Sequence, residues 1–195
     1  MSMSISLGRK ADGDRAAGFW TTPLRSKPML TKSEFLSFLE GEAATLSHLV
    51  SKAQPSHLAF RLTPAQRSTD ELIRYLATQW VGSVSYFVSG SWDGWSAAEQ
   101  AAKGVTPATF AAAMARQVAE VRQLLEPISE AEFATRPSKD PMGTAMPLAQ
   151  AIFGGTVAWT TGYKMQLFLQ LKAAGLADIG TSNLWMGVDK KAAQN

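Results

Sequence analysis

Apolar residues recur every three to four positions in four long stretches of the chain, which is the spacing of one face of an α-helix. Two stretches begin with a capping box, in which a Ser or Thr and a Glu three residues later satisfy the free amides of the first turn. These boxes are Thr31–Glu34 and Ser68–Glu71. The predicted helices span about 31–52, 68–90, 106–128 and 147–174. No stretch alternates as a half-buried strand does, so we expect an all-α fold, a four-helix bundle with long connections.

The segments outside the predicted helices set the domain boundaries. Residues 1–30 mix Gly, Ser, charged residues and Pro without periodicity, which indicates a loose or partner-ordered tail. Residues 53–67 and 129–146 form two long connections, and the connection after the second helix contains a helical turn over about 97–102. We therefore expect a tail of residues 1–30 and one bundle domain of residues 31–195.

The composition narrows the chemistry. The 195 residues include no Cys and two His, which excludes disulfides, thiolate nucleophiles and Cys-containing metal sites. His48 points away from the apolar stripe of its helix and His57 lies in a connection, so neither is expected to bind a metal or haem. We expect no resident metal and no cofactor.

Basic residues are concentrated before the first helix. Of 19 Lys and Arg, five lie in residues 1–30 beside two Asp, which leaves 14 residues of each sign in the rest of the chain. A nucleic-acid-binding surface usually needs a basic stripe, and none is visible, so no nucleic-acid partner is expected. The uncharged stretch 141–163 is too polar and glycine-rich to span a membrane, and no secretory signal is visible. We expect a cytoplasmic protein without a membrane partner.

Polar residues on the apolar faces are the candidate site, because burying them without partners is costly. Glu42 falls between Phe38 and Leu46 on the first helix, and Tyr75 and Gln79 lie on the apolar arc of the second. The fourth helix is expected to align Ile152, Thr156, Trp159, Tyr163, Gln166 and Gln170 on one face. Facing helices with such residues can enclose a ligand pocket.

A structural interpretation of these residues stays open beside the functional one. Buried Tyr and Gln side chains often pair with each other or with water and then only specify the packing. Glu42 is the most suggestive residue, because a lone carboxylate on an apolar face needs a partner or a raised pKa.

The segment Tyr163–Gly175 (YKMQLFLQLKAAG) resembles the last helix of the DinB-like superfamily. Residues Phe60–Leu72 are similar to the lead-in to that family's second helix, and Gly180–Asp189 (GTSNLWMGVD) is similar to the tail of one of its branches. The resemblance covers about residues 31–189. It implies a bundle of four long helices and, commonly, a homodimer.

Metal-binding members of the DinB-like superfamily carry one His on the second helix and a His-x3-His pair on the last. The matching positions here are Tyr75, Trp159 and Tyr163, and none of these side chains is a neutral nitrogen ligand. The resemblance therefore implies a branch that has lost the metal site, and with it the metal-activated water. An aromatic pocket is expected in its place.

Three functions stay open at this point. The first is binding of a small, partly apolar ligand in an inter-helix pocket formed by Tyr75, Gln79, Trp159, Tyr163 and Gln166. The second is a metal-independent enzyme that uses Glu42 as general base, or Tyr75 or Tyr163 as acid. The third is a structural or dimerisation protein without pocket chemistry, favoured by the apolar residues around much of the fourth helix.

Overall fold

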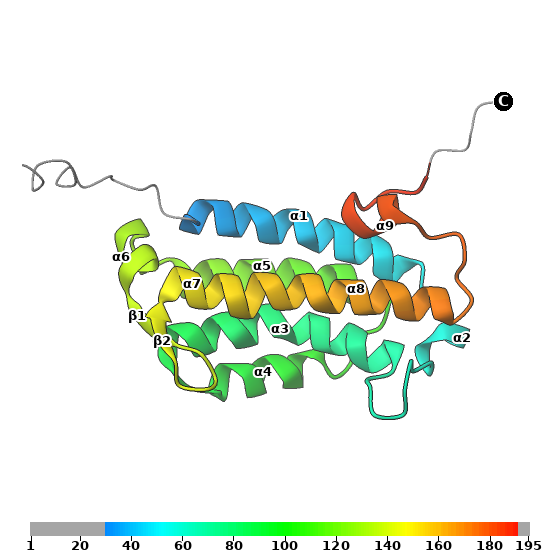
Figure 1. Cartoon of the computed structure of the whole chain (residues 1–195), viewed down its shortest axis with the longest axis horizontal. Helices are drawn as coiled ribbons and strands as arrows, with labels where there is room; N and C mark the ends of the chain where they lie inside the picture. Colours follow the sequence, from blue (N-terminus) through cyan, green and yellow to red (C-terminus); the bar gives the residue numbers. More distant parts are fainter. Residues whose placement is uncertain (1–29, 191–195) are drawn as a thin grey trace, which may run out of the picture.

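The computed structural model describes residues 30–190, and nearly all of its regular structure is helical (Figure 1). The predicted tail of residues 1–30 lies outside this range except for Leu30. The long helices are α1 (Lys32–Ser51), α3 (Thr69–Ser89), α5 (Phe110–Leu125) and α8 (Ala158–Ala173). The shorter helices are α2 (Pro55–Leu58), α4 (Asp93–Ala102), α6 (Glu130–Thr135), α7 (Leu148–Ile152) and α9 (Thr181–Trp185). The prediction of an all-α fold is confirmed.

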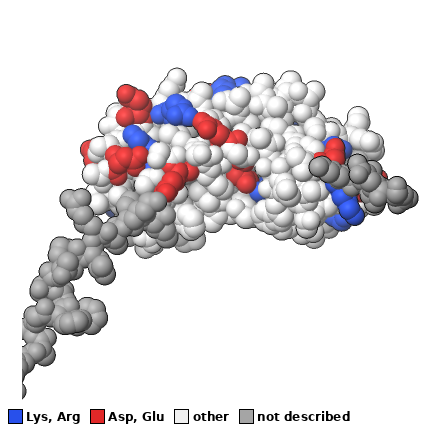
Figure 2. All heavy atoms as spheres, turned by 90° about the horizontal axis from the view of Figure 1, so that it is seen from above, with Lys and Arg blue, Asp and Glu red and all other residues white. Residues whose placement is uncertain are grey.

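Helix α3 is central to the packing. It contacts α4, α5 and α8, and α1 packs on α5 and on the C-terminal α9 (Figure 1). Side chains from these helices form one buried core, whose largest members include Phe35, Leu39, Leu46, Leu72, Leu76, Trp80, Phe110, Met114 and Phe133. On the face seen in Figure 2, Lys and Arg side chains are mixed with Asp and Glu, mainly near the two ends of the molecule.

The helix starts follow local sequence signals at most positions. Both predicted capping boxes are present, with the side chains of Thr31 and Ser68 accepting the N3 amides of α1 and α3. A third box, Ser129–Glu132, begins α6 and was not predicted. The third long helix was predicted to begin at Thr106, which is wrong. Residues 106–109 form a turn, in which Thr109 donates to the carbonyl of Thr106 at 3.0 Å, and α5 begins only at the buried Phe110.

One short two-stranded sheet, which the sequence pattern did not indicate, accompanies the helices. Strands β1 (Pro137–Lys139) and β2 (Ala145–Pro147) pair antiparallel in the segment expected to be a plain connection. Three residues are too few to show alternation. The loop between them is held by Asp140, whose Oδ1 accepts the amides of Met142 at 2.9 Å and Thr144 at 2.8 Å. These hydrogen bonds, the one from Thr144 first, lower the pKa of Asp140.

The fourth predicted helix is interrupted by one wide turn. The π turn η1 (Phe153–Val157) joins α7 to α8, and the amide of Ala158 bonds to the carbonyl of Phe153, five residues back. A π turn holds one residue more than an α-helical turn, and this rotates the buried face of the helix that follows. The buried face runs through Ile152, Thr156, Thr160 and Lys164. The predicted single face through Trp159, Tyr163 and Gln166 is therefore wrong: these three side chains are only partly buried.

Two adjacent glycines of η1 give a test of this packing. A Cβ at Gly155 would overlap the ring of Phe87, whereas a Cβ at Gly154 would meet nothing within 4 Å. We expect Gly155→Ala to lower the free energy of unfolding by about 1–3 kcal/mol, the usual cost of overpacking. The matched Gly154→Ala should be neutral or stabilising by up to about 1 kcal/mol. Urea denaturation measures both, and equal effects would contradict the placement of η1 against α3.

None of the helices within residues 30–190 combines the length and the apolar character needed to cross a membrane.

Candidate functional site

Two of the predicted site residues meet between α3 and α8. The rings of Tyr75 and Tyr163 have centroids 4.6 Å apart and planes inclined at 60°. Trp95 of α4 also packs against Tyr75, with centroids 5.7 Å apart. The guanidinium of Arg67, from the loop before α3, lies 4.0 Å from the Tyr75 centroid and 5.8 Å from that of Tyr163. Three aromatic rings and one cation therefore form a cluster in which the closest cation–π contact is at Tyr75.

A cavity of about 360 Å³ adjoins this cluster between α3 and α4. Its uncharged lining comes from Tyr75, Trp95, Ala102 and Thr78. Five charged residues complete the lining: Arg67, Arg74, Lys103, Glu71 and Glu99. The position of Trp95 depends on Gly82 of α3, because a Cβ there would lie 2.5 Å from the indole Cε3.

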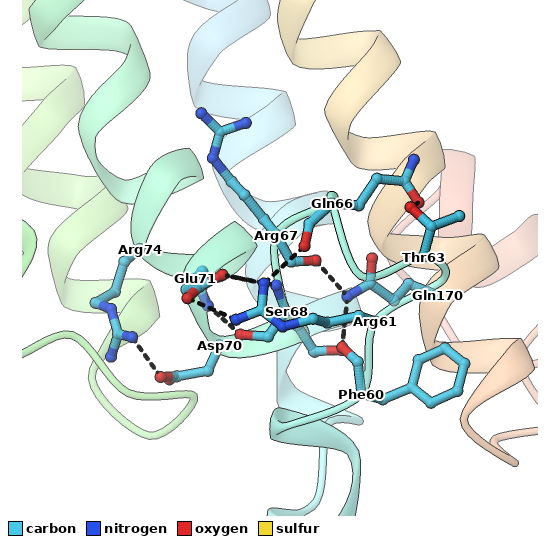
Figure 3. Close-up of polar contacts among 11 residues, drawn as sticks. Phe60, Arg61, Thr63, Gln66, Arg67, Ser68, Asp70, Glu71, Arg74 and Gln170 are labelled. Atoms are coloured by element: carbon cyan, nitrogen blue, oxygen red, sulfur yellow. Dashed lines mark hydrogen bonds and ion pairs between the residues drawn. The ribbon is translucent and has the colours of Figure 1, made fainter.

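Two of the charged lining residues are already neutralised by neighbours (Figure 3). Arg61 donates to both carboxylate oxygens of Glu71 at 2.7 and 2.8 Å, and this interaction, followed by the Ser68 amide, lowers the pKa of Glu71 to about 2. Arg74 pairs with Asp70 at 2.5 Å. These bonds leave Glu71 and Arg74 little net charge to offer a ligand.

Arg67 and Lys103 differ from this pattern. Neither side chain has an ion pair or hydrogen bond within residues 30–190, and both are exposed. In Figure 3 the Arg67 side chain extends away from the Arg61–Glu71 pair, toward the helices. Glu99 likewise has no ion pair in the described chain.

The loop that carries Arg67 is fixed by a buried amide of α8. Gln170 is fully buried, and its Nε2 donates to the carbonyl of Phe60 at 2.9 Å and to that of Arg67 at 3.1 Å. The same nitrogen lies 3.2 Å from the Thr69 hydroxyl at the start of α3. Gln170 therefore positions the backbone of Arg67.

Ionisation of Tyr75 should make the stability of the protein depend on pH. Burial, and then a hydrogen bond with Tyr163, raise the pKa of Tyr75 above its usual value of 10.0. The unfolded chain then loses this proton first, so the free energy of unfolding should fall as the pH rises above about 10. We expect Tyr75→Phe to reduce the loss of stability between about pH 9 and pH 11 in chemical denaturation. An identical alkaline loss in both proteins would contradict the burial of this hydroxyl.

Gln79, also predicted to bind a ligand, instead forms buried hydrogen bonds within the protein. Its side chain is fully buried, and Nε2 donates to the carbonyls of Gly155 at 3.4 Å and Thr156 at 3.2 Å. Its Oε1 lies 2.9 Å from the hydroxyl of Thr160, which also contacts the Thr156 carbonyl and accepts from the Trp80 indole at 2.8 Å. A π turn changes which amides the helix carbonyls bond to, and the Gln79 amide donates hydrogen bonds to two carbonyls at this turn.

Trp159 and Gln166 stand apart from the cluster. Each is partly buried, neither lines the α3–α4 cavity, and within residues 30–190 neither side chain makes a hydrogen bond or ring contact. Of the five residues predicted to bind a ligand, the structure brings together Tyr75 and Tyr163.

Glu42 has a partner that the sequence reasoning missed. Its Oε1 accepts a hydrogen bond from Lys164 Nζ at 2.8 Å, and its Oε2 lies 2.7 Å from the same nitrogen. The side chain of Lys164 is 2% exposed and that of Glu42 14%. The ring centroid of Trp185, from α9, lies 4.7 Å from Nζ. The sequence places Lys164 on the buried face only if the helix predicted over residues 147–174 contains the π turn η1.

The two histidines are structural. His48, expected on the side of its helix opposite the apolar stripe, is partly buried by the C-terminal segment, with Nε2 3.0 Å from Asn183 Nδ2 and 3.5 Å from Asp189 Oδ1. His57 is buried, and its Nδ1 accepts the amide of Gln54 at 3.1 Å. In the described part of the chain, no three His, Asp or Glu side chains gather closely enough to hold a metal ion.

The chain matches no protein-family model and aligns significantly with no curated protein.

Proposed function

We propose that this chain is a four-helix bundle protein of the DinB-like type that binds a small, partly apolar molecule between α3 and α4. The observation that carries the proposal is the cavity of about 360 Å³ lined by Tyr75 and Trp95. Small-molecule sites are typically concave, of about 300–1,000 Å³, with aromatic walls and a few polar groups that fix orientation. The proposal places the protein in the cytoplasm, without a resident metal.

The cavity lies on one side of the aromatic cluster, so the proposed site differs from the predicted one. Tyr75 is common to both, whereas the other four predicted residues do not line the cavity: Gln79, Trp159, Tyr163 and Gln166. The metal-independent enzyme is less well supported, because the carboxylate of Glu42 is held by Lys164. A general base must reach the substrate proton, and this pair would first have to separate.

A ligand screen tests the proposed function. The full chain, labelled with ¹⁵N, is titrated with a library of aromatic fragments while the indole N–H signals are followed by NMR. We expect binders that shift the Trp95 signal, and at least a tenfold loss of affinity in Trp95→Phe. Trp92→Phe is the matched control, because Trp92 neighbours Trp95 at 5.8 Å but does not line the cavity. The absence of binders, or binders unaffected by Trp95→Phe, would overturn the proposal.

Self-association is a second candidate role, favoured by the exposed surface of η1 and α8. Phe153 and Leu169 are 43% and 49% exposed, and Val157 and Met165 are partly exposed between them. Apolar side chains at such spacing suit a helix face covered by a second copy. We expect light scattering to give the mass of a homodimer and Leu169→Glu to give a monomer. A monomeric wild-type chain would contradict this role.

A further inference from the structure

The charges around the α3–α4 cavity do not balance. Glu71 is neutralised by Arg61 and Arg74 by Asp70. Arg67 and Lys103 remain, with Glu99 the one lining carboxylate that has no ion pair within residues 30–190. The lining therefore carries one excess positive charge, which a ligand with one negative charge would neutralise.

Arg67 is arranged to receive that charge. Its guanidinium lies over Tyr75 at 4.0 Å, and the loop backbone is held by Gln170 at 3.1 Å. The Arg67 side chain has no hydrogen bond or ion pair within residues 30–190, so its N–H groups remain available. The N–H groups of a guanidinium match the two oxygens of a carboxylate. An Arg held against a ring also loses less side-chain freedom on binding than an unconstrained one.

We propose that the ligand is an aromatic monocarboxylate, with its carboxylate on Arg67 and its ring against Trp95 and Tyr75. This inference rests on the proposed function and specifies its ligand. A dianion such as a phosphate monoester is disfavoured, because Glu71 and Glu99 also line the cavity and only one positive charge is in excess. A neutral aromatic molecule would leave that charge without a partner.

Matched probes separate the carboxylate from the ring. The full chain is titrated at low ionic strength with 3-phenylpropionate, 3-phenylpropionamide and 2-phenylethyl phosphate, and the Kd values are measured by NMR. We expect the carboxylate to bind about 10- to 100-fold more tightly than the amide, as a charge-assisted bidentate contact allows. It should also bind more tightly than the phosphate.

Substitutions at Arg67 test whether this residue carries the preference. Arg67→Gln should abolish the difference between carboxylate and amide, and Arg67→Lys should keep only part of it, because Lys lacks the bidentate fork. Arg116→Gln is the control, since Arg116 lies on α5 outside the cavity and pairs with Glu120 at 3.4 Å. Because Arg67 and Arg116 are exposed, both variants should fold, which thermal melts verify.

The outcomes distinguish the two proposals. If the acid and the amide bind equally and Trp95→Phe weakens both, the proposal of a carboxylate ligand is wrong. The proposed function would then still hold. A preference for the acid that survives in Arg67→Gln, or tighter binding of the phosphate, would also overturn the proposal of a carboxylate ligand. No binding of any probe, together with an empty fragment screen, would remove the proposed function itself.

Discussion

Lys164→Met is expected to lower the free energy of unfolding by about 3–5 kcal/mol. The reason is the burial of the pair: Lys164 is 2% exposed and its partner Glu42 14%, so removing the ammonium leaves a largely desolvated carboxylate without its counter-charge. The Met side chain is close in length to Lys, which keeps the change in packing small. Urea denaturation at pH 7 measures the effect.

The double variant Glu42→Gln/Lys164→Met is the control for this interpretation. Replacing both members of a buried ion pair is often close to neutral, because the cost of burying two charges disappears with their attraction. We therefore expect the double variant to recover most of the stability lost in Lys164→Met. Lys139→Met, at an exposed position of β1, should change stability by no more than about 0.5 kcal/mol. A small effect of Lys164→Met would show that the pair is hydrated.

Gln79→Leu should be the second most destabilising change, at about 3 kcal/mol. The fully buried amide gives hydrogen bonds to the carbonyls of Gly155 and Thr156, and its loss leaves those acceptors without this donor. Each buried polar group left without a partner costs about 1–3 kcal/mol. The Thr160 hydroxyl still contacts the Thr156 carbonyl, which limits the total.

Gln166→Leu is the matched control on α8. Gln166 is partly buried, and its side chain has no hydrogen-bond partner in the described chain. Its replacement should change the free energy of unfolding by no more than about 0.5 kcal/mol. Equal losses in the two variants would argue that Gln79 does not support the π turn.

The parts of the fold that were predicted correctly depend on neighbouring residues in the sequence. A capping box is complete within four residues, so Thr31–Glu34 and Ser68–Glu71 marked two helix starts. Gly90 ends α3 with φ 75°, a conformation that favours glycine. The hairpin was missed because its two strands have three residues each, too few to show alternation. The π turn was missed because it depends on distant partners. Gly155 lies under Phe87, and Gln79 reaches the turn from α3.

The residues of the candidate site also fall into those that could be predicted from sequence and those that could not. Tyr75 and Tyr163 could be predicted because regular helical spacing puts Tyr75 on the inner arc of α3, and Tyr163 stays beside it despite the shift after η1. Arg67 and Trp95 could not, because one comes from a loop and the other from α4, a helix expected only as a turn. Lys164 was missed because regular helical spacing through residues 147–174 put Tyr163 on the inner face, and the π turn η1 was not predicted. Only tertiary packing brings these residues together.

A crystal structure of the full chain with bound 3-phenylpropionate would test the ligand-binding account most directly. We expect density for the phenyl ring between α3 and α4, in contact with Tyr75 and Trp95, and for the carboxylate beside the guanidinium of Arg67. Density for the ligand elsewhere, or a cavity that stays free of it when the probe is saturating, would show that the proposed site is wrong.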